Sequence, residues 1–281
     1  MRFGVQWFAT DETPPPGAVA ALTEARGFES LFVTDHTHIP SERRTPGPDG
    51  ALELPRYYAR TLDPFVALTD AAATTSTLVL GTGVLLAAQR DPLATAKAAA
   101  SVDHLSGGRL LLGVGAGWNL EEVAAHGLDP SQRFSALREH VEAMRALWTQ
   151  EVAAYNGRHV RFAAAWSWPK PVKPIRVLVA GNGPTVLDRV LAFGDGWAPA
   201  DAGEAAMLPR LAELRERTDA AGRAPLPTTL FVAPRDVAAL ARYADAGVER
   251  AVWGLSGTSD LDEIERELDD LAGTTAAYAR G

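Results

Sequence analysis

Short apolar runs of strand length alternate along this chain with longer stretches of helical periodicity. The runs predict strands over 3–8, 30–34, 78–86, 109–114, 175–180, 195–198, 228–232 and 250–253. Most of them are apolar on both faces, which is typical of strands buried in a parallel sheet. The intervening stretches predict helices over 14–26, 63–76, 91–105, 131–149, 204–221, 234–246 and 261–272, with one more ending at 193.

This alternation predicts a single α/β domain over residues 1–281, folded as a (β/α)8 TIM barrel. An open, doubly wound sheet is the alternative. Two insertions interrupt the order, after strands 2 and 4. Residues 39–60 are rich in Pro, Gly and charge, and 41–60 are expected to form a mobile lid or substrate wall. Residues 151–174 are expected to form an irregular excursion outside the core.

Composition narrows the function classes. The chain has 281 residues, 47% of them apolar, a formal net charge of −8 and no cysteine. Disulfide and thiolate chemistry are therefore excluded, and the acidic balance argues against nucleic acid as a partner. No stretch has the length of a membrane span, and the N-terminus does not resemble a signal peptide. A soluble, cytoplasmic protein is expected.

The stretch Asp103–Asn119 is the most informative part of the chain. Gly107-Gly108 ends a helix, a buried strand follows, and Gly115-Ala116-Gly117 leaves bare backbone at the carboxyl end of that strand. A dinucleotide fingerprint fails because Trp118 stands where its third glycine would be. The chain has no G-x-x-x-x-G-K-[ST] phosphate loop either.

In a barrel, the residues that follow the strands line one mouth. They are mainly glycines, aromatic residues and amides, which suit a large planar ligand. The expected lining is Gln6, Trp7, Asp35, His36, Gly83, Val84, Ala116–Asn119, Gly181–Gly183, Trp197 and Trp253. Only Asp35 and His36 among them qualify as metal ligands, so no metal site is expected.

Two of these motifs carry the candidate chemistry. Gly181-Asn182-Gly183 is expected to start a helix and offer free N–H groups to a phosphate, or else to be a tight turn that binds nothing. Asp35-His36 is either a reactive pair or a helix cap beside a solvated imidazole.

Several motifs in order along residues 1–200 resemble the bacterial luciferase-like monooxygenase family. They are Asp35-His36, Gly81-Thr82-Gly83-Val84-Leu85, Arg90-Asp91-Pro92, Leu105–Trp118 and Ala180–Pro184. The run Gly113–Trp118, together with Glu121-Glu122, Arg133 and Glu139, is similar to the branch that uses the deazaflavin coenzyme F420.

The resemblance implies roles for individual residues. Gly83-Val84 would be joined by a non-prolyl cis peptide bond behind the cofactor ring, and Asp35 would contact the cofactor. Ala116, Gly117, Gly181, Asn182 and Gly183 would face the cofactor tail and phosphate. His36 would be the catalytic residue, as a proton donor or polariser beside the substrate. Sugar-phosphate dehydrogenases of the family carry a glutamate where this chain has Trp118, so a different substrate and proton route are expected.

The expected function is hydride transfer between coenzyme F420 and a small organic substrate. The alternatives are a monooxygenase that uses reduced FMN, a flavin-binding protein without turnover, and a flavin-free lyase or isomerase. A homodimer and a separate reductase or dehydrogenase that supplies reduced cofactor are the partners implied by the resemblance. No membrane or nucleic-acid partner is expected.

Overall fold

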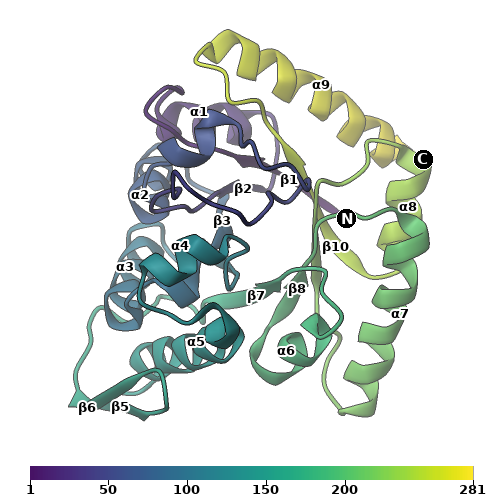
Figure 1. Ribbon diagram of the computed structural model, residues 1–281. Helices are drawn as coiled ribbons and strands as arrows, with labels where there is room; N and C mark the ends of the chain where they lie inside the picture. The colour runs from purple at the N-terminus through teal and green to yellow at the C-terminus, as the bar shows by residue number, and fades with distance from the viewer. Residues whose placement is uncertain (281) are drawn as a thin grey trace.

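Eight parallel strands form a closed barrel in the computed structural model, which describes residues 1–280 (Figure 1). The strands are β1 (Arg2–Trp7), β2 (Ser30–Val33), β3 (Val79–Leu85), β4 (Leu110–Val114), β7 (Arg176–Ala180), β8 (Gly196–Ala198), β9 (Thr228–Phe231) and β10 (Val248–Gly254). Their order around the barrel is β1-β10-β9-β8-β7-β4-β3-β2, and β1 pairs with both β10 and β2. This closure confirms the predicted TIM barrel and excludes the open sheet.

Helices surround the barrel. They are α1 (Pro16–Ala25), α2 (Pro64–Thr74), α3 (Pro92–Leu105), α5 (Arg133–Thr149), α6 (Val186–Phe193), α7 (Glu204–Ala220), α8 (Val237–Asp245) and α9 (Leu261–Arg280). The carboxylates of Asp63, Asp91 and Asp236 accept backbone N–H groups from the first turns of α2, α3 and α8. A short helix after β4, α4 (Leu120–Ala125), was not predicted, and α9 continues beyond the predicted end at 272.

The segment 151–174 is more ordered than predicted. It contains an antiparallel hairpin of β5 (Ala153–Asn156) and β6 (Arg161–Ala165). Glu139 of α5 anchors the hairpin turn, because its carboxylate accepts the backbone N–H groups of residues 158–160 at 2.6–3.1 Å. Ala153 and Val160 are buried. The prediction of an irregular excursion was therefore wrong here, since the hairpin covers one side of α5.

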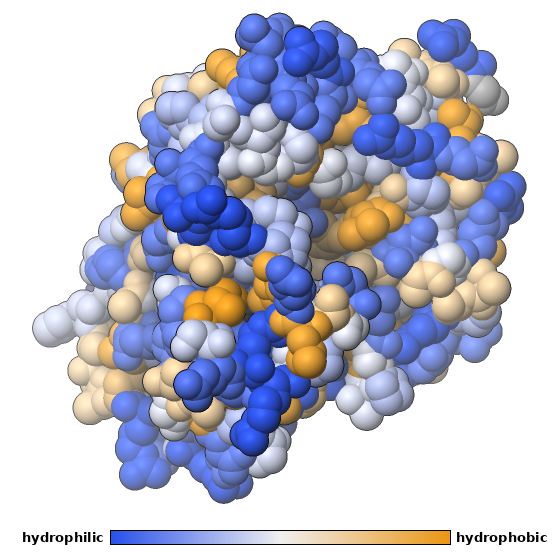
Figure 2. All heavy atoms as spheres, turned by 45° about the horizontal axis from the view of Figure 1, so that its top comes forward, coloured by the Kyte–Doolittle hydropathy of each residue, from blue (hydrophilic) through white to orange (hydrophobic). Residues whose placement is uncertain are grey.

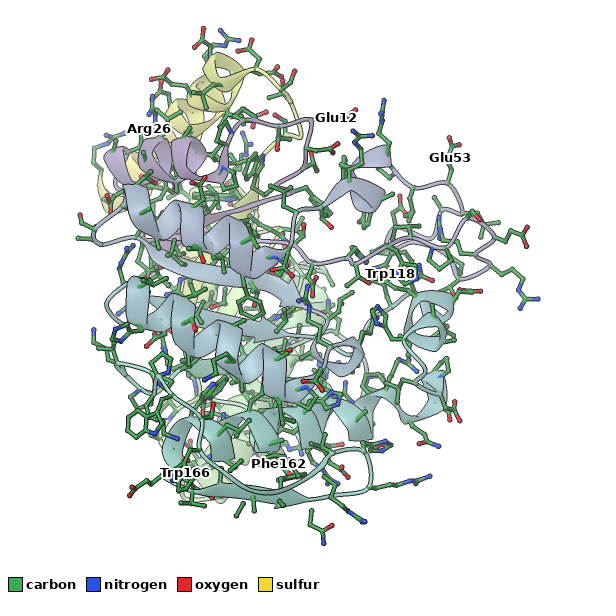
Figure 3. The ribbon with its side chains drawn as sticks, turned by 90° about the vertical axis from the view of Figure 1, so that its left-hand side faces the viewer. Glu12, Arg26, Glu53, Trp118, Phe162 and Trp166 are labelled. Carbon is green, nitrogen blue, oxygen red and sulfur yellow. The ribbon has the colours of Figure 1, made fainter. Side chains whose placement is uncertain are left out.

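Figure 3 shows the β5–β6 hairpin, with Phe162, at the bottom and the insertion after β2, with Glu53, at the upper right. The guanidinium carbon of Arg43 in this insertion lies 5.7 Å from the centre of the Trp118 ring. The regular structure of the insertion is limited to the 3-10 helix η1 (Arg56–Arg60). The backbone N–H of Arg44 donates to Glu121 at 3.0 Å, which joins the insertion to α4. Mobility of this segment stays a prediction.

Glycines allow the barrel interior to pack closely. The interior cluster comprises Phe32, Leu111, Leu178, Ala198, Phe231 and Val252. A Cβ atom on Gly81 would lie 2.3 Å from the Phe32 ring, and one on Gly113 would lie 2.4 Å from the Thr82 carbonyl oxygen. A side chain at either position would collide with these groups, so glycine is needed where the neighbouring atoms pack against the strand backbone.

A buried arginine closes the end of the barrel where the strands begin. Arg250 is completely buried, and it donates to both carboxylate oxygens of Glu29 at 2.6 Å and to Thr229 Oγ1 at 3.0 Å. Its guanidinium carbon lies 5.9 Å from the centre of the Phe32 ring. Burial acts to raise the pKa of Glu29, but the hydrogen bonds and the charge of Arg250 prevail and hold this pKa below its ordinary value.

Figure 2 shows mostly hydrophilic residues on one face, with small groups of hydrophobic ones between them. Among the described residues, no helix combines the length and the apolar character needed to cross a membrane.

Candidate active site

A cavity of about 160 Å³ opens where β1, β2 and β3 end. Its lining residues are Gln6, Phe8, Thr34, Asp35, His36, Tyr58, Gly83, Val84, Leu86 and Trp118. A second cavity of about 280 Å³ shares Gln6 and Phe8 with it and extends to Tyr57 and the segment Gly254–Gly257 after β10. Both lie at the carboxyl ends of barrel strands, the usual place of ligands in this fold.

The bond between Gly83 and Val84 is a cis peptide, as the resemblance implied. The side-chain amide of Gln6 donates a hydrogen bond to the Gly83 carbonyl oxygen. A Cβ atom at Gly83 would lie 2.9 Å from the Phe231 ring and 3.1 Å from Phe32 Cβ. Packing inside the barrel therefore requires glycine at position 83.

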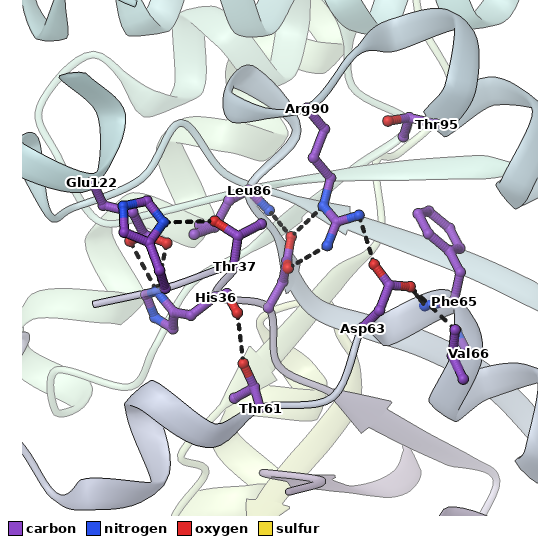
Figure 4. Close-up of polar contacts among 12 residues, drawn as sticks. His36, Thr37, Thr61, Asp63, Phe65, Val66, Leu86, Arg90, Thr95 and Glu122 are labelled. Atoms are coloured by element: carbon purple, nitrogen blue, oxygen red, sulfur yellow. Dashed lines mark hydrogen bonds and ion pairs between the residues drawn. The ribbon is translucent and has the colours of Figure 1, made fainter. Parts of the chain in front are cut away.

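The Asp35 carboxylate is fully engaged by neighbouring groups. Arg90 donates to its two oxygens at 2.9 and 2.7 Å, and the Leu86 N–H donates at 2.9 Å. Arg90 also donates to Asp63 at 2.9 Å, a contact drawn in Figure 4. Burial alone would lower the pKa of Arg90, but Asp35 and Asp63 raise it above its ordinary value. Asp35 thus fixes Leu86 and Arg90 beside the cavity, and its direct contact with a cofactor stays a prediction.

His36 pairs with a second buried carboxylate. Its Nδ1 lies 2.9 and 3.2 Å from the two oxygens of Glu122, a residue of α4 (Figure 4). The two side chains are 6% and 0% exposed. The His36 carbonyl accepts a hydrogen bond from Thr61 Oγ1 at 2.8 Å. The imidazole of His36 therefore lies at the cavity wall, where it could exchange a proton with a bound ligand.

The aromatic wall of the cavity differs from the one predicted. The core between the barrel and the helices contains Trp7, Trp197 and Trp253. The side chains of these three strand residues point away from the barrel interior, so they do not line the cavity. Phe8, Tyr58 and Trp118 line the cavity instead. All three follow the strands or belong to the insertion after β2.

The ring of His36 lies within this aromatic wall. Its centroid is 5.4 Å from that of Tyr58 and 5.8 Å from that of Trp118. Burial raises the pKa of the Tyr58 hydroxyl, so this phenol remains protonated at neutral pH.

Gly181, Asn182 and Gly183 form an exposed loop rather than the start of a helix. Helix α6 begins later, at Val186, with Thr185 at its N-cap. Arg210 of α7 donates to the carbonyl oxygens of Asn182 and Gly183 at 2.9 and 3.2 Å. The predicted helix start was therefore displaced, because Pro184 and Thr185 form the turn into α6. The guanidinium of Arg210 therefore places a positive charge beside this loop.

Ala116 and Gly117 do not line either cavity. Ala116 is buried, and Gly117 has φ of +86°. A Cβ atom on Gly117 would lie 2.3 Å from Gln89 Nε2. Gly117 therefore permits the chain to pass Gln89 on the way to Trp118, and its contact with a cofactor tail stays a prediction.

His36, Asp35, Gly83 and Val84 were predicted to lie at one site, and all four line the same cavity in the structure. Glu122 and Arg210 were not predicted to belong to any site. The pair Glu121-Glu122 follows a strand end, which is a weak signal for a carboxylate at the mouth. Arg210 carries no signal of this kind, since it lies in the middle of a helix.

Residues 15–280 match the luciferase-like monooxygenase family. An uncharacterized protein of Mycobacterium tuberculosis is 41% identical over 285 residues, which cover 98% of this chain and 99% of that protein. An F420-dependent glucose-6-phosphate dehydrogenase of Intrasporangium calvum is 32% identical over 202 residues. That alignment covers 69% of this chain and 56% of the dehydrogenase, so the chain matches only about half of the enzyme's length.

Two solved structures share the fold. The monooxygenase RslO1 from Streptomyces bottropensis has a TM-score of 0.79 at 20% identity, covering 99% of this chain and 100% of RslO1. An F420-dependent secondary alcohol dehydrogenase in complex with an F420–acetone adduct has a TM-score of 0.74 at 18% identity, covering 97% and 99%. With the family match over nearly all of its length, the chain belongs to the luciferase-like monooxygenase family.

Proposed function

We propose that this protein is an oxidoreductase that transfers a hydride between the deazaflavin coenzyme F420 and a small organic substrate. The observation that carries the proposal is the placement of His36 in one cavity with Gly83, Val84 and the aromatic side chains of Phe8, Tyr58 and Trp118. The name of the Intrasporangium relative, which is 32% identical, supports F420 as the cofactor.

The residues at the mouth fit a planar cofactor. Thr34 Oγ1 is buried in the cavity wall without a hydrogen-bond partner among the described residues, so it is available to a ligand. Phe8 and Trp118 offer aromatic surface. No atom lies within 4 Å of the position that a Cβ would take on Gly183, which leaves backbone open beside Arg210. A bound deazaflavin supplies the donor or acceptor of the hydride.

The residues of the chain supply the remaining functions. His36 gives or takes the proton at the oxygen atom of the substrate, a role that imidazole side chains commonly fill in enzymes. Tyr58 and Trp118 flank the imidazole and exclude water from the reacting groups. By the family resemblance, Trp118 stands where the sugar-phosphate dehydrogenases carry a glutamate. The substrate is therefore expected to differ from a sugar phosphate.

A monooxygenase that uses reduced FMN is the second candidate. The name of RslO1 is consistent with the monooxygenase reaction, whereas the use of FMN is what the family resemblance implies. Titration of the cofactor-free protein with F420 and with FMN distinguishes the candidates. We expect F420 to bind at least tenfold more tightly, a difference of about 1.4 kcal/mol. Tighter binding of FMN would favour the monooxygenase, and binding of neither would contradict both.

A further inference from the structure

We propose that Glu122 is a positioning residue for His36. Its buried carboxylate holds the imidazole in the tautomer with hydrogen on Nδ1, so that Nε2 is the atom that exchanges a proton with the substrate. This inference rests on the proposed function for its chemical consequence, whereas the tautomer itself does not depend on any cofactor.

The burial of Glu122 is the first observation. Its side chain has no exposed surface, and its carboxylate has His36 Nδ1 as its one hydrogen-bonding partner among the described residues. A buried carboxylate without a hydrogen-bond partner is strongly unfavourable, so the single partner of Glu122 is important for its burial. Both oxygens lie within 3.2 Å of the same nitrogen. The carboxylate is therefore directed at Nδ1.

The local structure fixes this arrangement at both ends of α4. The side chain of Asn119 accepts a hydrogen bond from the Glu122 N–H at 3.4 Å. At the other end, Nε2 of His126 lies 2.7 Å from Thr37 Oγ1. Helix α4 is thus tied to His36 and Thr37, two consecutive residues that follow β2. The geometry of the carboxylate comes from the backbone and needs no ligand to form.

The tautomer follows from the chemistry of the two groups. An ionised carboxylate only accepts hydrogen bonds, so Nδ1 must donate and Nε2 carries the lone pair. No hydrogen bond engages Nε2 within the described residues, and His36 lines the cavity. If the substrate is an alcohol, its hydroxyl proton would move to Nε2, and the bound coenzyme would supply the acceptor of the hydride. In carbonyl reduction the imidazolium would return this proton, and Glu122 would stabilise the imidazolium.

The tautomer is measured by ¹⁵N NMR on the cofactor-free protein with labelled histidine. The signal of His36 is assigned by its loss in His36→Ala. We expect the neutral imidazole to carry its proton on Nδ1 in the wild type, to lose this preference in Glu122→Gln and to keep it in Glu122→Asp. Glu139→Gln is the matched control, because it alters a buried carboxylate at the β5–β6 hairpin.

Turnover supplies the second readout. In hydrolase triads, replacing the carboxylate by an amide lowers kcat about 10⁴-fold through the wrong tautomer. We expect Glu122→Gln to lower kcat by at least about 10²-fold and to leave the Kd of the cofactor almost unchanged, and Glu122→Asp to restore part of the loss.

A wild-type proton on Nε2 would overturn the inference, because it would mean that Glu122 is protonated and donates. An unchanged tautomer in Glu122→Gln would overturn it as well. Failure of F420 to bind the wild type would instead count against the proposed function alone.

Discussion

His36 is the residue on which the proposed chemistry depends most directly. Its ring is held by Glu122, Tyr58 and Trp118, and none of these contacts involves the Asp35–Arg90 pair. We therefore expect His36→Ala to bind the cofactor nearly as the wild type does, while single-turnover rates fall about 10²–10⁴-fold, the usual effect of losing a general acid or base. Full turnover of the variant on its substrate would assign His36 a structural role.

Gly183 tests the loop that is expected to receive the cofactor phosphate. No atom lies within 4 Å of a Cβ placed there, and its φ lies outside the left-handed region, so Gly183→Val is compatible with the fold. The added side chain would occupy the space in front of the bare backbone. We expect the Kd for the cofactor to rise at least tenfold, or about 1.4 kcal/mol, with an unchanged Tm. An unchanged Kd in isothermal titration would remove this loop from the site.

At the scale of elements, Glu24 links α1 to the segment that leads into β3. Its carboxylate accepts the backbone N–H groups of Ser76, Thr77 and Leu78 and the hydroxyl of Thr77. Burial acts to raise the pKa of Glu24, but these hydrogen bonds prevail and lower it to about 2. The folded protein therefore releases this proton more readily than the unfolded chain, whose glutamate has an ordinary pKa.

The free energy of unfolding should accordingly include a contribution from Glu24 that is fully present above the ordinary pKa of 4.5. The contribution is lost as the pH falls from there to about 2. Urea unfolding of the wild type and of Glu24→Gln between these pH values measures it. We expect the difference between the two proteins to shrink as the pH falls, and a constant difference would contradict the assignment.

The elements that sequence could predict were those with a strong local pattern. Apolar runs marked all the barrel strands, and aspartate or proline marked the starts of α2 and α3. The short helix α4 has too few residues to show a helical period. The β5–β6 hairpin was missed because its alternation is weak, with Ala153 buried among exposed neighbours.

The residues of the candidate site that lie near strand ends were predictable from the sequence, whereas their partners from distant parts of the chain were not. His36 follows β2 and Gly83 lies near the carboxyl end of β3, and such positions can be predicted from the order of elements alone. The partner of His36 could not be read in this way, since Glu122 is 86 residues away in the sequence. Only folding brings the ends of β2 and β4 to the same wall. The same holds for Arg210, which reaches the Gly181–Gly183 loop from α7.

At the scale of the whole molecule, substitution of Arg250 tests whether the stability of the fold and the binding of the cofactor depend on different ends of the barrel. Arg250 is buried where the strands begin, and its pair with Glu29 joins β10 to the segment before β2. Breaking a fully buried pair costs about 3–5 kcal/mol. Glu29 is 25% exposed and keeps Arg2 at 3.4 Å, so we expect Arg250→Ala to lower the free energy of unfolding by somewhat less than that amount. Guanidinium unfolding measures the change.

Two comparisons make this test specific. Arg235→Ala breaks the exposed pair with Asp270 and should have a much smaller effect on unfolding. The Kd of the cofactor should stay the same in Arg250→Ala below its unfolding transition, because the mouth lies at the other end of the strands. A loss of cofactor binding that matches the loss of stability would show that the two ends are coupled.

The short chain segment after β4 has a consequence for how this enzyme class could be diversified. Trp118 lines the cavity, Asn119 is the N-cap of α4, and Glu122 is hydrogen-bonded to His36. These three residues lie close together in the sequence. Exchange of the segment 116–126 would replace, in a single genetic event, one wall of the substrate pocket and the hydrogen-bonding partner of His36. The barrel strands and the Gly83-Val84 bond would remain as they are. Libraries that recombine residues 116–126 as a block are therefore the economical route to new substrates on this scaffold.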